Sequence, residues 1–275
     1  MLFLASLSLG EIVSKPAANM TKIDAYSLTT VPIEVCANGN PFANATGFIW
    51  KRGEQHYLIT NWHVVTGKNA QTGKQESPAT PDMLRVLFNL RMQHFGKQQY
   101  DINIRDKDHR PLWFTHPARQ RGSDVVAIPL PMRDDDPIIG LHPINVLKSE
   151  ADLAVRIGMD VFILGYPFGA PPPGYPVWKR GSIASEPDLT RIGAGYMLVD
   201  TASRPGMSGA PVIRRSWGMH VLKDDAISAR GDPQSKFIGI YSGRLHTKNK
   251  EDAQLGMVWP VEDIEEVIIG QKIDQ

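Results

Sequence analysis

The sequence predicts an all-β protein, and three features of the chain support this. The first is a series of short segments rich in β-branched, aromatic and aliphatic residues, bounded by Gly, Pro, Asn or charged turns, which is typical of strands. The second is the scarcity of long segments with the 3.6-residue period of a helix. The third is an ordinary globular composition, with 42% hydrophobic and 21% charged residues over 275 positions. Together they favour a sandwich or barrel over alternating strands and helices.

The expected elements follow in order along the chain. Residues 47–50 and 56–60 flank the polar turn 51–55 and predict a hairpin. Further strands are predicted at 84–88, 124–128, 161–164, 197–199, 211–213 and 237–241. A single helix is predicted at 261–269, where Pro260 precedes the first turn and Gly270 is the stop signal.

A polar, proline-rich stretch at 129–137 divides the chain into two β halves. We expect an N-terminal extension at 1–25, a first half at 26–132 and a linker at 133–145. A second half at 146–260 and a C-terminal helix with its tail at 261–275 follow.

Composition excludes several classes of protein. A formal charge of +1 gives no electrostatic reason to bind nucleic acid or an anionic membrane. Cys36 is the only cysteine, so a disulfide-stabilised fold is excluded, and the chain lacks both paired cysteines and a His-Glu-x-x-His zinc motif. We therefore expect no metal and no cofactor. The oligomeric state is not readable from the sequence.

The N-terminus bears on location. Residues 1–9 are apolar, but the first basic residue, Lys15, follows this run instead of preceding it as in a secretory leader. We expect a docked terminal segment rather than a leader cleaved within residues 1–20. No segment reaches the ~18 apolar residues of a membrane span. We expect a cytoplasmic protein, with export or a periplasmic location as the alternative.

Three segments carry the chemistry. His63 follows the strand at 56–60, Asp124 opens the strand at 124–128, and Ser208 lies between glycines just before the strand at 211–213. A serine hydroxyl becomes a useful nucleophile when an imidazole takes its proton, and a carboxylate must fix the imidazole's tautomer. The oxyanion that forms needs preorganised backbone N–H donors. Gly206 and Ser208 are the residues placed to supply them.

The order His, Asp, Ser resembles that of the chymotrypsin-fold, trypsin-like serine peptidases. The similarity rests on Thr60-Asn61-Trp62-His63, Asp124-Val125-Val126-Ala127 and Gly206-Met207-Ser208-Gly209-Ala210-Pro211. Residues 165–169, 200–202, 237–240 and 256–260 also match in the expected order. The nearest resemblance is to the bacterial, disulfide-free branch that includes the high-temperature-requirement proteases and glutamyl endopeptidases.

This resemblance implies two six-stranded antiparallel barrels with a short C-terminal helix, and a serine endopeptidase that hydrolyses polypeptides through an acyl-enzyme. His63 is then the general base, Asp124 the orienting carboxylate and Ser208 the nucleophile, with Gly206 and Ser208 forming the oxyanion hole. The substrate pocket is expected at Ala202, Ser203, Tyr241, Ser242 and Gly243. Because Ala202 puts no carboxylate at its base, we expect a small or medium apolar residue before the scissile bond.

The chain also departs from the family pattern. Met207 replaces the Asp with which vertebrate digestive enzymes bind their new amino terminus, so that mode of activation is unavailable. Ala210 replaces a glycine, which is tolerated where φ is negative. The separation of 61 positions from His63 to Asp124 implies an insertion at 67–81 or 93–111.

Two other functions fit parts of the pattern. The Gly206–Ala210 segment half fits the nucleophile elbow of an α/β-hydrolase, but that fold needs its acid and its histidine after the serine, on alternating strands and helices. A catalytically inactive barrel serving as a binding or scaffold module keeps the fold without the chemistry. The serine endopeptidase is the function that the three motifs favour together.

Overall fold

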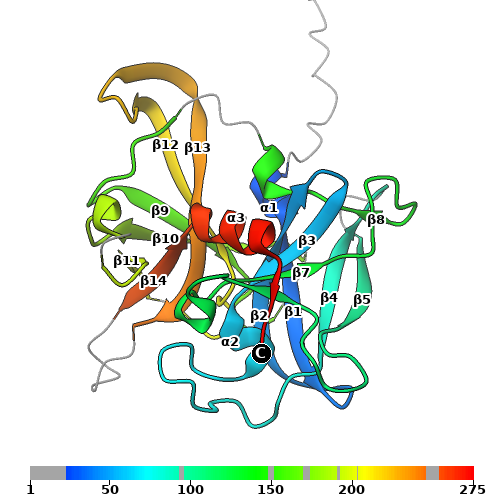
Figure 1. The fold of residues 1–275 in the computed structure, drawn as a ribbon. Helices are drawn as coiled ribbons and strands as arrows, with labels where there is room; N and C mark the ends of the chain where they lie inside the picture. Colours follow the sequence, from blue (N-terminus) through cyan, green and yellow to red (C-terminus); the bar gives the residue numbers. More distant parts are fainter. Residues whose placement is uncertain are drawn as a thin grey trace, which may run out of the picture.

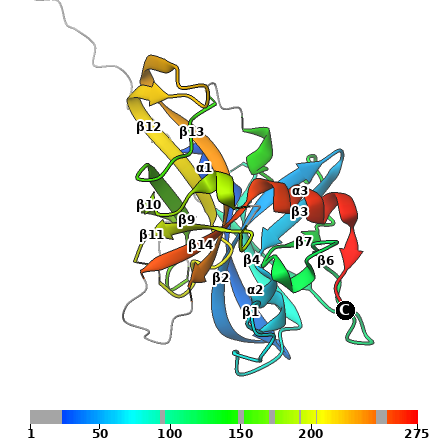
Figure 2. The ribbon, with the colours of Figure 1, turned by 60° about the vertical axis from the view of Figure 1, so that its left-hand side comes forward.

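A computed structural model describes residues 23–92, 96–147, 152–169, 174–190, 193–202, 204–245 and 254–275. It contains two antiparallel β units that lie side by side, with α3 (Val261–Gly270) across them (Figures 1 and 2). The predicted all-β class with a C-terminal helix is confirmed. The expected N-terminal extension lies almost wholly outside the described residues, as does any leader.

The first unit is built on six longer strands, as expected, to which three two-residue strands are added. The longer strands are β1 (Thr30–Ala37), β2 (Asn40–Arg52), β3 (Gln55–Thr60), β4 (Met83–Leu90), β5 (Lys97–Asn103) and β7 (Val126–Pro129). The short strands are β6 (Phe114–Thr115), β8 (Ile139–Gly140) and β15 (Lys272–Ile273). Along the sheet the order is β15-β6-β7-β3-β2-β1-β4-β5, with β8 paired to β4. The tail after α3 therefore returns to the first unit.

The second unit is a closed barrel of six strands in the order β10-β11-β14-β13-β12-β9. Its strands are β9 (Asp160–Gly165), β10 (Val177–Ile183), β11 (Met197–Asp200), β12 (Pro211–Val221), β13 (Ile227–Arg244) and β14 (Leu255–Pro260). Strands β12 and β13 continue beyond the barrel as a long hairpin (Figure 1).

The remaining helices are short. They are α1 (Ala25–Thr29), α2 (Trp62–Thr66) and the 3₁₀ turns η1 (Gln120–Gly122), η2 (Ile144–Val146) and η3 (Pro187–Leu189). The predicted stop of α3 is one residue early, because Gly270 is still helical and Gln271 takes the left-handed conformation at φ 45°. A Cβ on Gly270 would lie 2.9 Å from Pro117, so close packing explains the glycine. Within the described ranges, no helix is long and apolar enough to cross a membrane.

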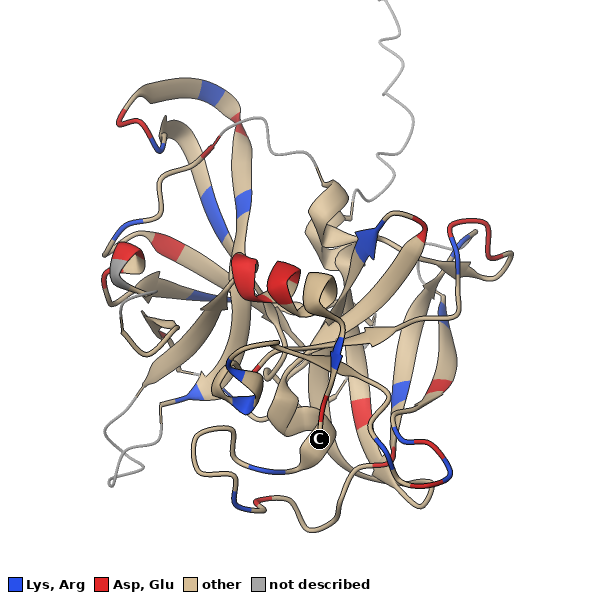
Figure 3. Cartoon of the chain, viewed as in Figure 1, with Lys and Arg blue, Asp and Glu red and all other residues tan. Residues whose placement is uncertain are grey.

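A shared apolar cluster joins the first unit, called the first barrel from here on, to the closed barrel of the second unit. Phe48, Trp50 and Ile59 of the first barrel pack with Leu164, Ile213, Ile240 and Trp259 of the second, and with Ile264, Val267 and Ile268 of α3. Burial of this contact fixes the barrels relative to one another, and the site forms along the same seam. Acidic and basic residues are interspersed over both barrels (Figure 3), in keeping with the formal charge of +1.

Candidate active site

His63 lies on a single helical turn that directly follows β3. Gly67 ends this turn in the left-handed conformation, at φ 70°, and its N–H donates to the His63 carbonyl at 2.9 Å. Asn61, two residues before His63, is fully buried and donates from Nδ2 to the Asp124 backbone carbonyl oxygen at 2.7 Å. The backbone that carries His63 is therefore tied to the backbone that carries Asp124.

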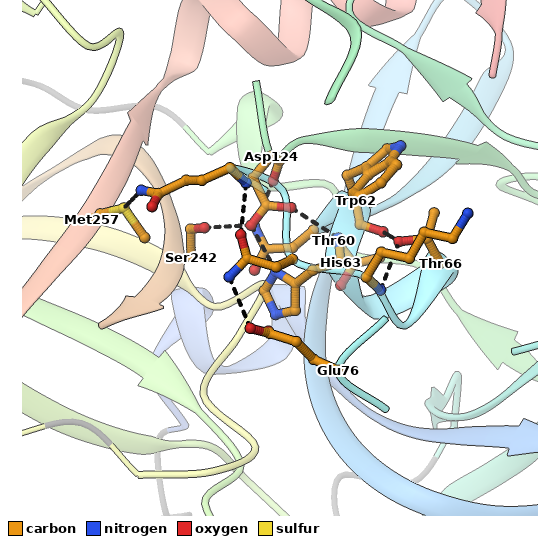
Figure 4. A network of polar contacts seen from close by, with 12 residues as sticks. Thr60, Trp62, His63, Thr66, Glu76, Asp124, Ser242 and Met257 are labelled. Atoms are coloured by element: carbon orange, nitrogen blue, oxygen red, sulfur yellow. Dashed lines mark hydrogen bonds and ion pairs between the residues drawn. The ribbon is translucent and has the colours of Figure 1, made fainter. Parts of the chain in front are cut away.

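Asp124 is 2% exposed and accepts three hydrogen bonds. Its Oδ1 accepts from the His63 backbone N–H at 2.9 Å, and its Oδ2 lies 2.6 Å from His63 Nδ1. The Ser242 hydroxyl, from β13 of the second barrel, also donates to Oδ2 (Figure 4). An ionised carboxylate is an acceptor only, so these donors fix both oxygens. The contact leaves Nε2 as the basic atom of the His63 ring.

The charge on the His63 ring is set by opposing effects. Burial disfavours the charged ring and lowers its pKa. The charge and the hydrogen bond of Asp124, together with the charge of Glu76, favour the charged ring. These effects outweigh burial, so the pKa of His63 is raised. Figure 4 shows the ring between the Asp124 and Glu76 side chains. Glu76 comes from the segment 67–81, one of the two places where an insertion was predicted, and its carboxylate accepts from Asn69 Nδ2 at 2.9 Å. This segment therefore reaches the site.

Ser208 lies in a turn whose backbone is held from the first barrel. Gly206 and Gly209 have φ of 93° and 85°, which favour glycine, and a Cβ on Gly209 would lie 2.0 Å from the Thr46 carbonyl oxygen. The Thr46 N–H donates to the Ser208 carbonyl at 2.8 Å. The Thr46 hydroxyl donates to the Gly206 carbonyl at 2.7 Å. Ala210 does not have a positive φ, which is why the alanine is accommodated.

Among the described residues, two amide groups of this turn are free to bind a ligand, and the others donate to backbone carbonyls. The Pro205 carbonyl accepts from the Phe168 N–H at 3.4 Å. Within the described part of the chain, the N–H groups of Gly206 and Ser208 donate to no acceptor, and no hydrogen bond joins the Ser208 hydroxyl to the His63 ring. His63 and Ser208 nevertheless line the same two cavities. Met207, between the two amides, is 1% exposed and packs in the core of the second barrel.

The predicted substrate pocket is placed only in part. Ser242 and Gly243 line a cavity of about 260 Å³ together with His63, Asp124 and Ser208. Tyr241 is fully buried in the core of the second barrel instead, because successive side chains of a strand point to opposite faces. Ala202 is half-buried and does not line this cavity. Ser203 lies outside the described residues.

Sequence reasoning missed one site residue, Thr46, and one contact of another, Ser242. Ser242 was predicted in the pocket, which it lines, but its hydroxyl also binds the Asp124 carboxylate. Thr46 stands in no motif, and no sequence signal marks it. Among the described residues, no group of three or more His, Cys, Asp or Glu side chains is placed to hold a metal ion.

A second serine–histidine pair provides a comparison within the same chain. Ser216 Oγ lies 2.6 Å from His220 Nδ1 on β12, and both side chains are buried. The other ring nitrogen of His220 contacts the Arg230 carbonyl at 3.3 Å. This pair has a backbone carbonyl where His63 has a carboxylate.

The family assignment rests on the sequence. A sequence profile of the trypsin-like peptidase domain matches residues 45–219, which is more than half of the chain and includes His63, Asp124 and Ser208. The chain belongs to the trypsin-like peptidases. Its two barrels and terminal helix are those expected for this family, and the protein is a serine-type endopeptidase acting on polypeptides. Comparison with curated protein sequences gives no match.

Solved structures similar to this peptidase are distant in sequence. An inactive mutant form of Rv3671c from M. tuberculosis is 17% identical, with a TM-score of 0.45, and the match covers 89% of this chain and 87% of that one. The serine endoprotease from Yersinia pestis is 14% identical, with a TM-score of 0.48 and coverage of 91% and 67%. At these values the family assignment is based on the sequence match alone.

Proposed function

We propose that the protein hydrolyses peptide bonds through Ser208 as nucleophile, His63 as general base and Asp124 as the carboxylate that orients the base. The observation that carries this proposal is the 2.6 Å contact between His63 Nδ1 and Asp124 Oδ2, beside a cavity that Ser208 also lines. A tautomer with its proton on Nδ1 presents the lone pair of Nε2 to the cavity. This is the arrangement that nucleophilic hydrolysis requires.

The reaction divides into two acyl transfers. Ser208 Oγ attacks the substrate carbonyl carbon while its proton passes to His63 Nε2, and the Asp124 carboxylate stabilises the resulting imidazolium. The oxyanion accepts hydrogen bonds from the Gly206 and Ser208 N–H groups. The imidazolium then protonates the leaving amine as the C–N bond breaks, which leaves an acyl-enzyme. Water, activated by His63, hydrolyses this ester and restores the Ser208 hydroxyl.

The contact between Ser208 and His63 closes when substrate is bound. Catalytic hydrogen bonds are often long in the free enzyme and tighten in the complex. The free N–H groups of Gly206 and Ser208 support an oxyanion hole that is available before substrate arrives. Ser242 and Gly243, which line the cavity next to Ser208, are the residues proposed to contact the substrate before the scissile bond.

Labelling with a fluorophosphonate probe tests the proposal. The wild-type protein should react at Ser208, and Ser208→Ala should abolish labelling and lower kcat by at least about 10⁴-fold, because the nucleophile is removed. Ser216→Ala is the matched control, since it removes a serine that also contacts a histidine but lies outside the cavity. Labelling should be retained in this variant.

The opposite outcomes identify the alternative. Labelling that survives Ser208→Ala, or turnover of peptide by that variant, overturns the assignment of the nucleophile. A folded wild-type protein that neither labels nor cleaves polypeptide is instead an inactive barrel that serves as a binding or scaffold module.

A further inference from the structure

A second cavity lies beside Ser208, on the side of the first barrel, and its walls are largely apolar. Its volume is about 250 Å³. The strands β1 and β2 contribute one wall and the insertion at 67–81 contributes the other. The apolar residues of the two walls are Val35, Phe42, Ala43, Ala45, Pro78 and Pro81.

The cavity is continuous with the catalytic groups. It shares His63, Glu76 and Ser208 with the cavity that contains Ser242 and Gly243. A polypeptide with its scissile carbonyl at Ser208 therefore places one flank in each cavity. Because Ser242 and Gly243 are proposed to contact the residue before the scissile bond, the apolar cavity faces the residues after it.

The walls are held before substrate binds. The N–H groups of Glu76 and Ser77 both donate to the Gly67 carbonyl, at 2.9 and 3.0 Å, which closes the insertion on itself. The Ser77 hydroxyl donates to the Ala79 carbonyl at 2.5 Å, and Pro81 is buried. A preformed wall loses little freedom when a ligand binds, which favours affinity.

The charged residues of the cavity do not select a charged ligand. Lys68 and Glu76, of opposite sign, both line it, so their fields partly cancel. The apolar walls then decide which side chain binds best, because an apolar group gains by leaving water while a charged group loses hydration.

We propose that this cavity binds an apolar substrate side chain within two positions after the scissile bond, so the peptidase selects bonds followed by such a residue. The inference rests on the proposed function and adds a substrate class to it. Differences of one methylene in an apolar pocket change kcat/KM by about 10- to 200-fold. We therefore expect Leu or Phe at this position to be preferred over Gly or Asp by at least about 10-fold.

Profiling of a peptide library by the full chain tests the inference, with the active molecules counted by fluorophosphonate labelling before each digestion. Ala43→Asp introduces a charge at an exposed wall position and should remove the apolar preference. Ala43→Trp should fill the cavity and shift the preference to small residues. Ala226→Asp, the same substitution at an exposed turn between β12 and β13, should leave the profile unchanged.

The outcomes separate this inference from the proposed function. Cleavage without an apolar preference after the scissile bond overturns the inference alone. A preference that Ala43→Asp and Ala43→Trp both leave intact also overturns it. A wild-type protein that neither labels nor cleaves overturns the proposed function and this inference with it.

Discussion

His63 and Asp124, in the first barrel, are held by hydrogen bonds to the Asp124 side chain, whereas Ser208, in the second barrel, is held through the backbone of its turn. Asp124 accepts from three donors, one of them in the other barrel. The hydroxyl of Ser208 has no such partner among the described residues, while its turn is bound to Thr46. The proposed base, His63, is thus oriented before substrate binds, and the proposed nucleophile, Ser208, keeps a free side chain on a fixed backbone.

This difference predicts that substitutions on the His63–Asp124 side of the site and on the Ser208 side will affect catalysis in different ways. Substitution on the side of the base should change the protonation and orientation of the His63 ring. Substitution on the side of the nucleophile should change the position of the oxyanion donors and leave the ionisation of His63 as it was.

Replacing the carboxylate of Asp124 should have the largest effect of the three variants that follow. Asp124→Asn keeps the size of the side chain but favours the wrong tautomer of His63, so kcat should fall by about 10⁴-fold. Asp134→Asn is the matched control, because Asp134 also contacts a histidine, His56, at 3.0 Å, outside both cavities. Steady-state kinetics on one peptide measure both variants. A loss below about 10-fold for Asp124→Asn would show that His63 does not depend on this contact.

Loosening the turn of the nucleophile should have a smaller effect. Thr46→Val removes the hydroxyl that donates to the Gly206 carbonyl and accepts from the Tyr166 N–H at 3.1 Å. Both partners are buried, and an unpaired buried group costs about 1–3 kcal/mol. We expect kcat to fall by about 10- to 100-fold with little change in KM, as the oxyanion donors move.

Thr46→Ser serves as the control for this variant, because it retains the hydroxyl. It should recover most of the lost kcat. A lower melting temperature for Thr46→Val with unchanged kcat would mean that the hydroxyl stabilises the fold without positioning the oxyanion hole.

Thr46 also marks the limit of what the sequence predicts. The strands, the C-terminal helix and the three segments proposed to be catalytic are readable because each depends on local composition or on a motif of a few residues. Thr46 and Gly206 are 160 positions apart, and no sequence pattern in either segment indicates that they are in contact. Such a contact follows from the packing of two barrels, which single-sequence patterns do not encode.

The path of the segment 67–81 could not be predicted from the sequence. The spacing of His63 and Asp124 gives the length of chain between them, whereas the path of this segment follows from its own turns, such as those that bind the Gly67 carbonyl. Tyr241 and Ser242 show the same limit at the scale of one residue. A one-residue difference in position decides which side chain faces the cavity and which faces the core.

The pH dependence of kcat/KM should show the smallest effect, and it distinguishes the His63 side of the site from the Ser208 side most specifically. His63 must be neutral to act as a base, and its raised pKa means that kcat/KM should increase with pH through a midpoint above the ordinary value of about 6.5. Glu76→Gln removes one of the charges that raise this pKa, so the midpoint should move to lower pH and the relative rate near pH 6 should increase. Glu54→Gln, in the exposed turn between β2 and β3, should leave the midpoint unchanged.

Because Glu76 acts on the base and not on the turn of Ser208, Thr46→Val should lower the rate at every pH without moving the midpoint. A midpoint shifted by Thr46→Val, or unaffected by Glu76→Gln, would contradict the separation of the two halves.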